Sequence, residues 1–109
     1  MENFQLKDMV KGWFVGDIQP TALSTIACEV AVKAYQAGEY EPAHFHKIAT
    51  ETTLILEGEV VMCGKTWSEG DIIVLPPGTV TDFRVVRDAK TVVVKVPGAL
   101  NDKYIVSES

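Results

Sequence analysis

The sequence has no long hydrophobic run and no concentration of basic residues. No apolar stretch approaches the roughly 20 residues that span a bilayer as a helix. The N-terminal segment alternates charged and apolar residues, unlike the apolar centre of a signal peptide. Ten basic residues stand against 15 acidic ones, the net charge is −5, and the basic residues are scattered along the chain. We therefore expect a cytoplasmic protein whose partners include neither nucleic acid nor a membrane.

Cysteine and histidine are equally scarce, with two of each in 109 residues. Cys28 lies in a strand-like stretch and Cys63 lies beside a glycine turn. This spacing fits neither a disulfide scaffold nor a zinc site, so we expect two reduced, structural thiols.

Helical periodicity is nearly absent, because no amphipathic 3.6-residue pattern extends beyond two turns. Short alternating or β-branched segments are instead separated by glycine and proline turns, one of them the type II turn expected at 76–78. The spacing predicts an all-β antiparallel sandwich or barrel, in a single domain that covers residues 1–109. The expected strands are 25–36, 52–56, 59–62, 65–67, 71–75, 80–86, 91–96 and 104–106.

The alternation also predicts which side chains face the interior. In the segment 25–36, the apolar face would carry Cys28, Val30, Val32 and Ala34. Further along the chain, we expect Ile55, Phe83 and Val85 inside, together with the small polar residues Thr53 and Thr81. The aromatic pair Trp13 and Phe14 is expected to pack in the core or in a dimer contact.

Both histidines lie in the stretch AHFHKIATETTLILEG, at 43–58, with a glutamate shortly after them. His44 and His46 are two residues apart, so on a strand they project from the same face. A short loop can return the carboxylate of Glu51 to the same place. Two imidazoles and one carboxylate are a ligand set for Fe, Mn, Ni, Zn or Cu. The alternative is that all three are solvated residues at strand ends.

The glycines and prolines around this stretch extend the pattern. The spacings are Gly38-x5-His44-x-His46-x4-Glu51-x6-Gly58 and, further on, Gly70-x5-Pro76-x-Gly78. They resemble the first motif and the first half of the second motif of the cupin superfamily, over residues 25–96. The resemblance implies a double-stranded β-helix, or jelly-roll barrel, whose terminal strands pack on it or dimerise. It also implies a divalent metal ion held by His44, His46 and Glu51, and often a homodimer.

The sequence departs from the second cupin motif at one important point. The family places a histidine, its fourth ligand, three residues after the glycine, and an asparagine four residues later. Here these positions are Thr81 and Val85. Alternation points the neighbouring Asp82 outward, so we expect Thr81 to line the pocket, where its hydroxyl can hydrogen-bond a metal-bound water. Three ligands bind an ion less tightly than four but leave a coordination position open.

Three functional hypotheses follow from these residues. The first is a small metal-binding cupin that acts on or binds a small polar molecule in the barrel, with carbohydrate chemistry as one subset. The second is a non-catalytic ligand-binding cupin, and the third is a structural dimer with a degenerate metal site. No second carboxylate stands in an evident pair with Glu51 for acid–base chemistry, and Lys47 is expected to be a solvated loop residue. The sequence leaves open whether the protein is an enzyme.

Overall fold

A computed structural model describes residues 1–106. Apart from one 3-10 turn at Leu6–Asp8, its regular structure is entirely β, which confirms the predicted class. No helix in the described part is long and apolar enough to cross a membrane. The strands are β1 Trp13–Val15, β2 Glu29–Tyr35, β3 Tyr40–Phe45, β4 Thr50–Met62, β5 Lys65–Ser68, β6 Ile72–Leu75, β7 Thr81–Val96 and β8 Tyr104–Ile105.

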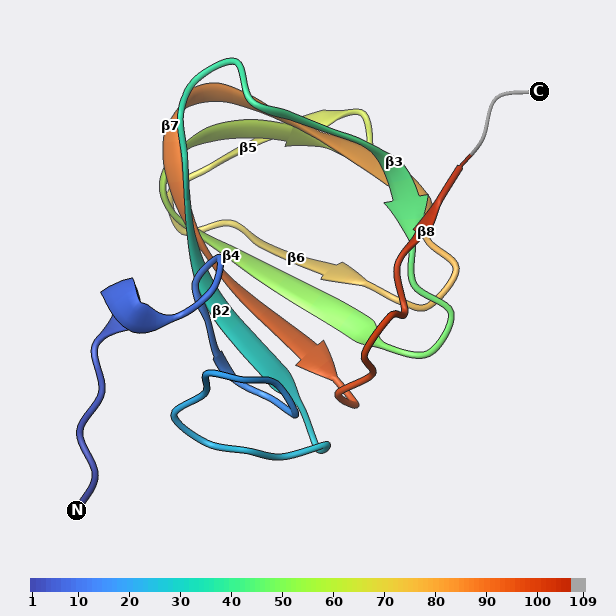
Figure 1. Ribbon diagram of the computed structural model, residues 1–109. Helices are drawn as coiled ribbons and strands as arrows, with labels where there is room; N and C mark the ends of the chain where they lie inside the picture. The colour runs from blue at the N-terminus through green and yellow to red at the C-terminus, as the bar shows by residue number, and fades with distance from the viewer. Residues whose placement is uncertain (107–109) are drawn as a thin grey trace.

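The strands form one antiparallel sheet that curls into a jelly-roll barrel (Figure 1). The long strands β4 and β7 pair with each other and pass from one half of the barrel into the other. In one half the order is β1-β2-β7-β4-β6, and in the other it is β8-β3-β7-β4-β5. The two halves face one another across the interior, so side chains from both halves can meet there.

Two predicted breaks between strands are wrong, because β4 and β7 bend at these points and do not end there. The sequence predicts a turn at 57–58 and a gap at 87–90, but both strands are continuous and the ladder shifts register at three points between Ile55 and Val60. Gly58 has φ +95°, and a Cβ there would lie 2.3 Å from the carbonyl oxygen of Asp88. Glycine is needed here because the strands approach so closely that they bend through bulges.

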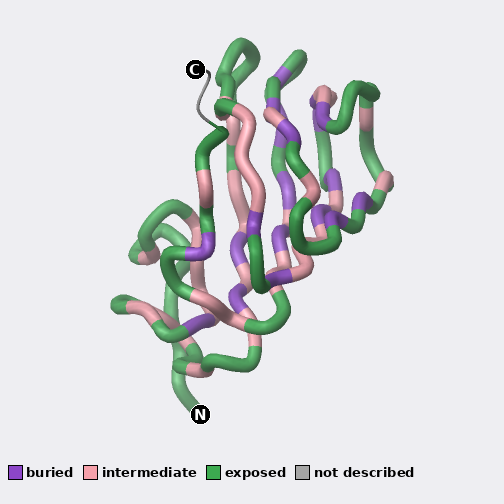
Figure 2. The backbone as a smooth tube through the Cα atoms, turned by 90° about the vertical axis from the view of Figure 1, so that its right-hand side faces the viewer, coloured by how far each residue is buried: buried purple, intermediate pink, exposed green. Residues whose placement is uncertain are grey.

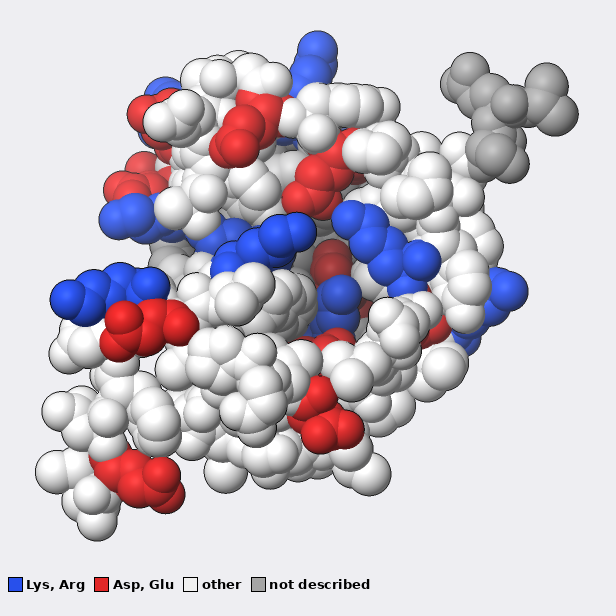
Figure 3. Space-filling view, in the orientation of Figure 1, with Lys and Arg blue, Asp and Glu red and all other residues white. Residues whose placement is uncertain are grey.

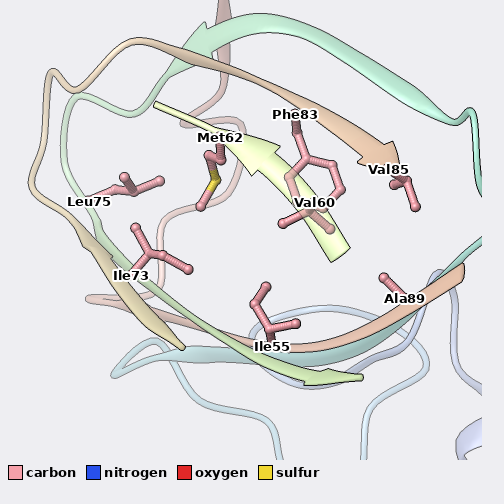
Figure 4. Close-up of a cluster of buried hydrophobic side chains, with 8 residues drawn as sticks. All are labelled: Ile55, Val60, Met62, Ile73, Leu75, Phe83, Val85 and Ala89. Carbon is pink, nitrogen blue, oxygen red and sulfur yellow. The ribbon is translucent and has the colours of Figure 1, made fainter. Parts of the chain in front are cut away.

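The apolar core lies along this bend (Figure 4). Ile55, Phe83 and Val85 are buried as predicted, with exposed fractions of 0%, 7% and 2%. Buried and exposed residues alternate along the barrel strands (Figure 2), as expected for strands with one face inward. The cluster consists of Ile55, Val60, Met62, Ile73, Leu75, Phe83, Val85 and Ala89.

The predicted inward face of β2 is wrong. Ala31 is fully buried and Glu29 is 7% exposed, whereas Val30 and Val32 are only half-buried. The outer face of β2 also has a cover, because Val32 lines an apolar depression together with Phe14 and residues of the N-terminal segment. Both faces are therefore partly buried, and the apolar alternation follows the outer one.

The segments near the chain ends provide one edge strand in each half of the barrel. β1 pairs with β2, and β8 pairs with β3. Between β7 and β8 the chain crosses the end of the barrel (Figure 1) and carries Asp102 to the loop that follows β3. This crossing positions one of the two histidines.

Candidate functional site

The interior of the barrel contains a cavity of about 260 Å³ that is lined from β1, β2, β3, β4, β6 and β7. The four residues that the sequence singles out, His44, His46, Glu51 and Thr81, all line it. A hollow in the face of the molecule is visible in Figure 3, with basic side chains along its rim. A small molecule fits a space of this size.

His46 lies directly after β3 and is only 7% exposed. Its Nδ1 is 2.7 Å from the backbone carbonyl oxygen of Asp102. Since a carbonyl can only accept, Nδ1 carries the proton, and in the neutral ring Nε2 keeps its lone pair. Nε2 is 3.6 Å from Oε1 of Glu51.

His44 lies within β3 and is half-buried. Its Nδ1 is 2.9 Å from the carbonyl oxygen of Pro42, so this ring also has Nε2 as its free nitrogen. The two imidazoles form an edge-to-face contact, with centroids 5.7 Å apart and planes at 80°. A register shift between Glu41 and His44 sets the side-chain directions in this part of β3.

Glu51, the second residue of β4, lies opposite Lys95 of β7. The hydroxyl of Thr53 donates to Oε2 of Glu51 at 3.4 Å. Burial alone would raise the pKa of Glu51, but the neighbouring His46 and the charge of Lys95 outweigh it and hold the pKa below its usual value. Glu51 is therefore ionised at neutral pH.

Comparison with known proteins rests on structure. No protein-family model matches this sequence, and no curated protein matches it. An uncharacterized conserved protein with a double-stranded β-helix domain, from Klebsiella pneumoniae, superimposes with a TM-score of 0.65 and 23% identity, over 77% of this chain and 78% of that one. A protein of unknown function with a cupin-like fold, from Ralstonia eutropha, gives a TM-score of 0.65 and 14% identity, over 88% and 57% of the two chains. The chain has the cupin fold.

One similar structure is that of an enzyme. The DMSP lyase DddQ from Ruegeria pomeroyi superimposes with a TM-score of 0.69 and 24% identity. The match covers 86% of this chain but 49% of the lyase, so this chain spans about half the length of that protein. These superpositions establish the shared fold. At sequence identities this low they leave the reaction open.

Thr81 occupies the cupin position at which a fourth ligand would stand. Its hydroxyl oxygen accepts the backbone N–H of Cys63 at 2.7 Å and donates to the carbonyl of Asp82 at 2.7 Å. The Asp82 side chain does not line the cavity and accepts a hydrogen bond from the Tyr40 hydroxyl at 3.3 Å. The hydroxyl of Thr81 therefore fastens the start of β7 to the turn after β4.

The donor chemistry of the three predicted ligands fits a divalent ion, whereas their arrangement is only partly closed. Two ligand atoms, each about 2.1 Å from one ion, lie about 3–4 Å apart, and the 3.6 Å between His46 and Glu51 is in this range. The free Nε2 of His44 is a donor of the right kind. No group of three His, Cys, Asp or Glu side chains within residues 1–106 is gathered closely enough to hold an ion.

Asp102 is a positioning residue that gives no signal in the sequence. It is 5% exposed, and its carboxylate accepts the backbone N–H groups of Lys47, Ile48 and Ala49 at 2.9–3.2 Å. Burial alone would raise the pKa of Asp102, but these donors hold it below its usual value. The same residue orients His46 through its carbonyl, so one aspartate fixes both the ring and the loop behind it.

A second carboxylate, Glu41, also lines the cupin cavity, although the sequence offered no evident companion for Glu51. Glu41 hydrogen-bonds the side chain of Tyr35, whose ring lies 5.0 Å from that of Phe83. Burial raises the pKa of Tyr35 strongly, and the negative charges of Glu41 and Glu51 raise it further. Tyr35 therefore keeps its proton and can donate a hydrogen bond.

Trp13 and Lys47 differ in how they compare with the positions expected from the sequence. Trp13 is half-buried and lies outside the core cluster; it lines the cavity, with the ammonium groups of Lys33 and Lys95 each 5.0 Å from its ring centroid. Lys47 is exposed as predicted and lies over the ring of Tyr104, 4.2 Å from its centroid. The pairing that brings Trp13 to the cavity joins β1 to β2, and local sequence does not specify it.

Proposed function

We propose that this protein binds a small polar molecule in the cupin cavity, beside a divalent metal ion held by His44, His46 and Glu51. One observation carries the proposal. His46 is locked by the Asp102 carbonyl with Nε2 directed toward the ionised Glu51, in the same cavity that His44 lines. A backbone partner on Nδ1 is the usual support of a metal-ligating histidine.

The donor set of two nitrogens and one carboxylate oxygen suits Fe, Mn, Ni, Zn or Cu. A bound ion of this kind supplies Lewis-acid chemistry and open coordination positions. Glu51 provides a negative charge and, when it is not engaged, a proton acceptor next to Thr53. Tyr35 provides a hydrogen-bond donor on the same cavity wall. Together these groups bind and orient a polar molecule, and carbohydrates are one class of ligand that we expect.

Metal uptake tests this proposal directly. Chelated protein is loaded separately with Fe(II), Mn(II), Ni(II), Zn(II) and Cu(II), and bound metal is counted by mass spectrometry after removal of free ions. We expect about one ion per chain for at least one metal. His46→Ala and His44→Ala should each lose most of the bound metal. The control Lys65→Ala leaves all three proposed ligands in place and should bind as much metal as the unaltered protein. Negligible uptake of all five metals by the unaltered protein would contradict the proposal.

A second candidate function is a binding module without catalysis. The favouring observation is Thr81, whose hydroxyl is engaged by backbone groups at the position of the fourth ligand. Such a module would be stabilised by its ligand in the chelated protein, in proportion to ligand excess over Kd, with no turnover. The homodimer implied by the cupin resemblance stays a proposal, and sedimentation velocity over a concentration series tests it.

A further inference from the structure

Four lysines line the cavity of a protein whose net charge is −5. Lys33 lies on the inner face of β2 and Lys95 on that of β7, while Lys11 and Lys103 come from segments next to the terminal strands. They are four of the ten basic residues in the chain. Basic side chains around the hollow are visible in Figure 3. The cavity therefore has a local charge opposite to that of the whole molecule.

Within the described residues, none of these four ammonium groups forms an ion pair with a carboxylate. Throughout residues 1–106, the one ion pair of a lysine is that of Lys90 with Glu57, on the exposed surface. The Nζ atoms of Lys33 and Lys95 instead lie on the ring of Trp13. A cation–π contact directs an ammonium group without neutralising its charge. Positive charge is thus held at the cavity and remains available to a ligand.

The environment of Lys33 reflects this concentration of charge. Partial burial lowers the pKa of Lys33, and the charges of Lys95, Lys103 and Lys11 lower it further, against the opposing effect of Glu41. The folded protein therefore carries an unfavourable gathering of cations. An anion placed among them would relieve it.

The rest of the cavity lining favours a neutral polar group. Glu41 and Glu51 also line it, so the four lysines leave an excess of two positive charges, while the two glutamates disfavour an anionic group placed beside them. Thr91, 1% exposed, lines the cavity opposite Lys33, and its hydroxyl has no hydrogen-bond partner among the described residues. A buried hydroxyl without a partner is costly, and a ligand oxygen would satisfy it.

We propose that the cavity receives a small organic acid, with its carboxylate at Lys33 and Lys95 and its uncharged polar end toward Thr91 and the pair of His46 and Glu51. This inference rests on the proposed function, because the acid would occupy the same cavity. It adds the chemical class of the ligand. It also gives Trp13 a role, since this ring holds both ammonium groups in place.

The test compares acids with neutral molecules of the same shape. Backbone amide NMR shifts of chelated protein are followed during titration with D-glucuronate or D-glucose, and with lactate or lactamide. We expect at least one acid to bind saturably and about tenfold more tightly than its neutral counterpart, with affinity falling as salt is added. Inorganic phosphate should bind more weakly than that acid. Equal binding of acid and neutral partner, no saturable binding of either acid, or tighter binding of phosphate would overturn the proposal.

Variants locate the effect. Lys33→Gln and Lys95→Gln should each weaken binding of that acid about tenfold, whereas Lys65→Gln, on the β5 hairpin away from the cavity, should leave it unchanged. Equal losses in all three variants would indicate net charge alone and overturn the assignment. Because these titrations use chelated protein, failure of metal uptake and failure of acid binding are seen separately. Metal uptake by Lys33→Gln should match that of the unaltered protein.

Discussion

The barrel interior has two regions, and inward-facing residues of the same two strands, β4 and β7, contribute to both. Near the bend, β4 and β7 contribute Ile55, Val60 and Val85, which are 0–2% exposed and entirely apolar. Further along, the same strands contribute Glu51 and Lys95, which line the cavity. The pleat is the same in both regions, so the difference lies in the residues placed on it.

This difference separates stability from ligand chemistry within one sheet. Burial of a Val or Ile side chain contributes about 1.5–3 kcal/mol. The polar residues of the cavity contribute less and need partners, as His46 and Glu51 have in Asp102 and Thr53. Thr91 lies between the two regions and has none among the described residues. We therefore expect substitutions near the bend to change folding and substitutions in the cavity to change binding.

The largest expected effect is at Ile55. Ile55→Ala should lower the free energy of unfolding by about 2–5 kcal/mol, because it leaves a void in the core beside the bend. Thr53→Ala, two residues away on the same face, should cost about 1 kcal/mol, since it removes one hydrogen bond to Glu51. Urea unfolding followed by tryptophan fluorescence measures both. Equal losses would remove the distinction between the two regions.

Asp102→Ala should have the next largest effect, about 2 kcal/mol, because three backbone N–H groups, that of Ala49 buried and the other two partly buried, lose a charged acceptor. Loosening of the loop should also weaken metal binding by His46 about tenfold. Asp88→Ala is the matched control, since Asp88 is exposed and accepts a single backbone N–H, that of Ala37. If both variants lose the same stability in urea, the positioning role of Asp102 is wrong.

Thr91→Val should stabilise the protein by about 1 kcal/mol, because valine keeps the shape and removes a buried hydroxyl without a partner among residues 1–106. The same variant should bind glucuronate or lactate less tightly if the hydroxyl meets the ligand. Thermal unfolding and the NMR titration provide the two readouts. A destabilised Thr91→Val would show that the hydroxyl is already hydrogen-bonded in solution.

The smallest expected effect is at Lys33, where Lys33→Gln should stabilise the free protein by up to about 0.5 kcal/mol while weakening acid binding. Since the pKa of Lys33 is lowered on folding, the charged lysine destabilises the fold at neutral pH. As pH rises through the folded-state pKa toward the unfolded value of about 10.4, the folded protein releases this proton first, and the advantage of the variant should shrink. Urea unfolding at several pH values measures this trend, and a pH-independent difference would contradict it.

The strands were largely predictable, because alternation and turn residues are local properties of the chain. The turn at 76–79 is an example, with a hydrogen bond from the N–H of Thr79 to the carbonyl of Pro76 and Gly78 at φ +85°. The continuity of β4 and β7 was not predictable. A glycine between two strand-like segments predicts a turn. Gly58 instead accommodates a bulge within β4, which the close approach of β7 imposes.

The candidate site was predictable only in part. The spacing of His44, His46 and Glu51 places them in one cavity, and their binding of a metal ion stays a prediction. The inner face of β2 was predicted wrongly, and Lys33 lies on the face opposite the one predicted to point inward. Glu41 and Asp102 have no pattern around them that marks a site, because their roles depend on residues distant in the chain.

By itself, the sequence determined that the chain is a β barrel and that two histidines and a glutamate stand at cupin spacing, since both facts depend on short-range periodicity. Only the tertiary structure decided that Asp102 orients His46 across 56 positions of the chain. It also decided that four scattered lysines converge on one cavity in an acidic protein. The physical reason is that pairing between distant strands, driven by burial of the core, sets which side chains share a space.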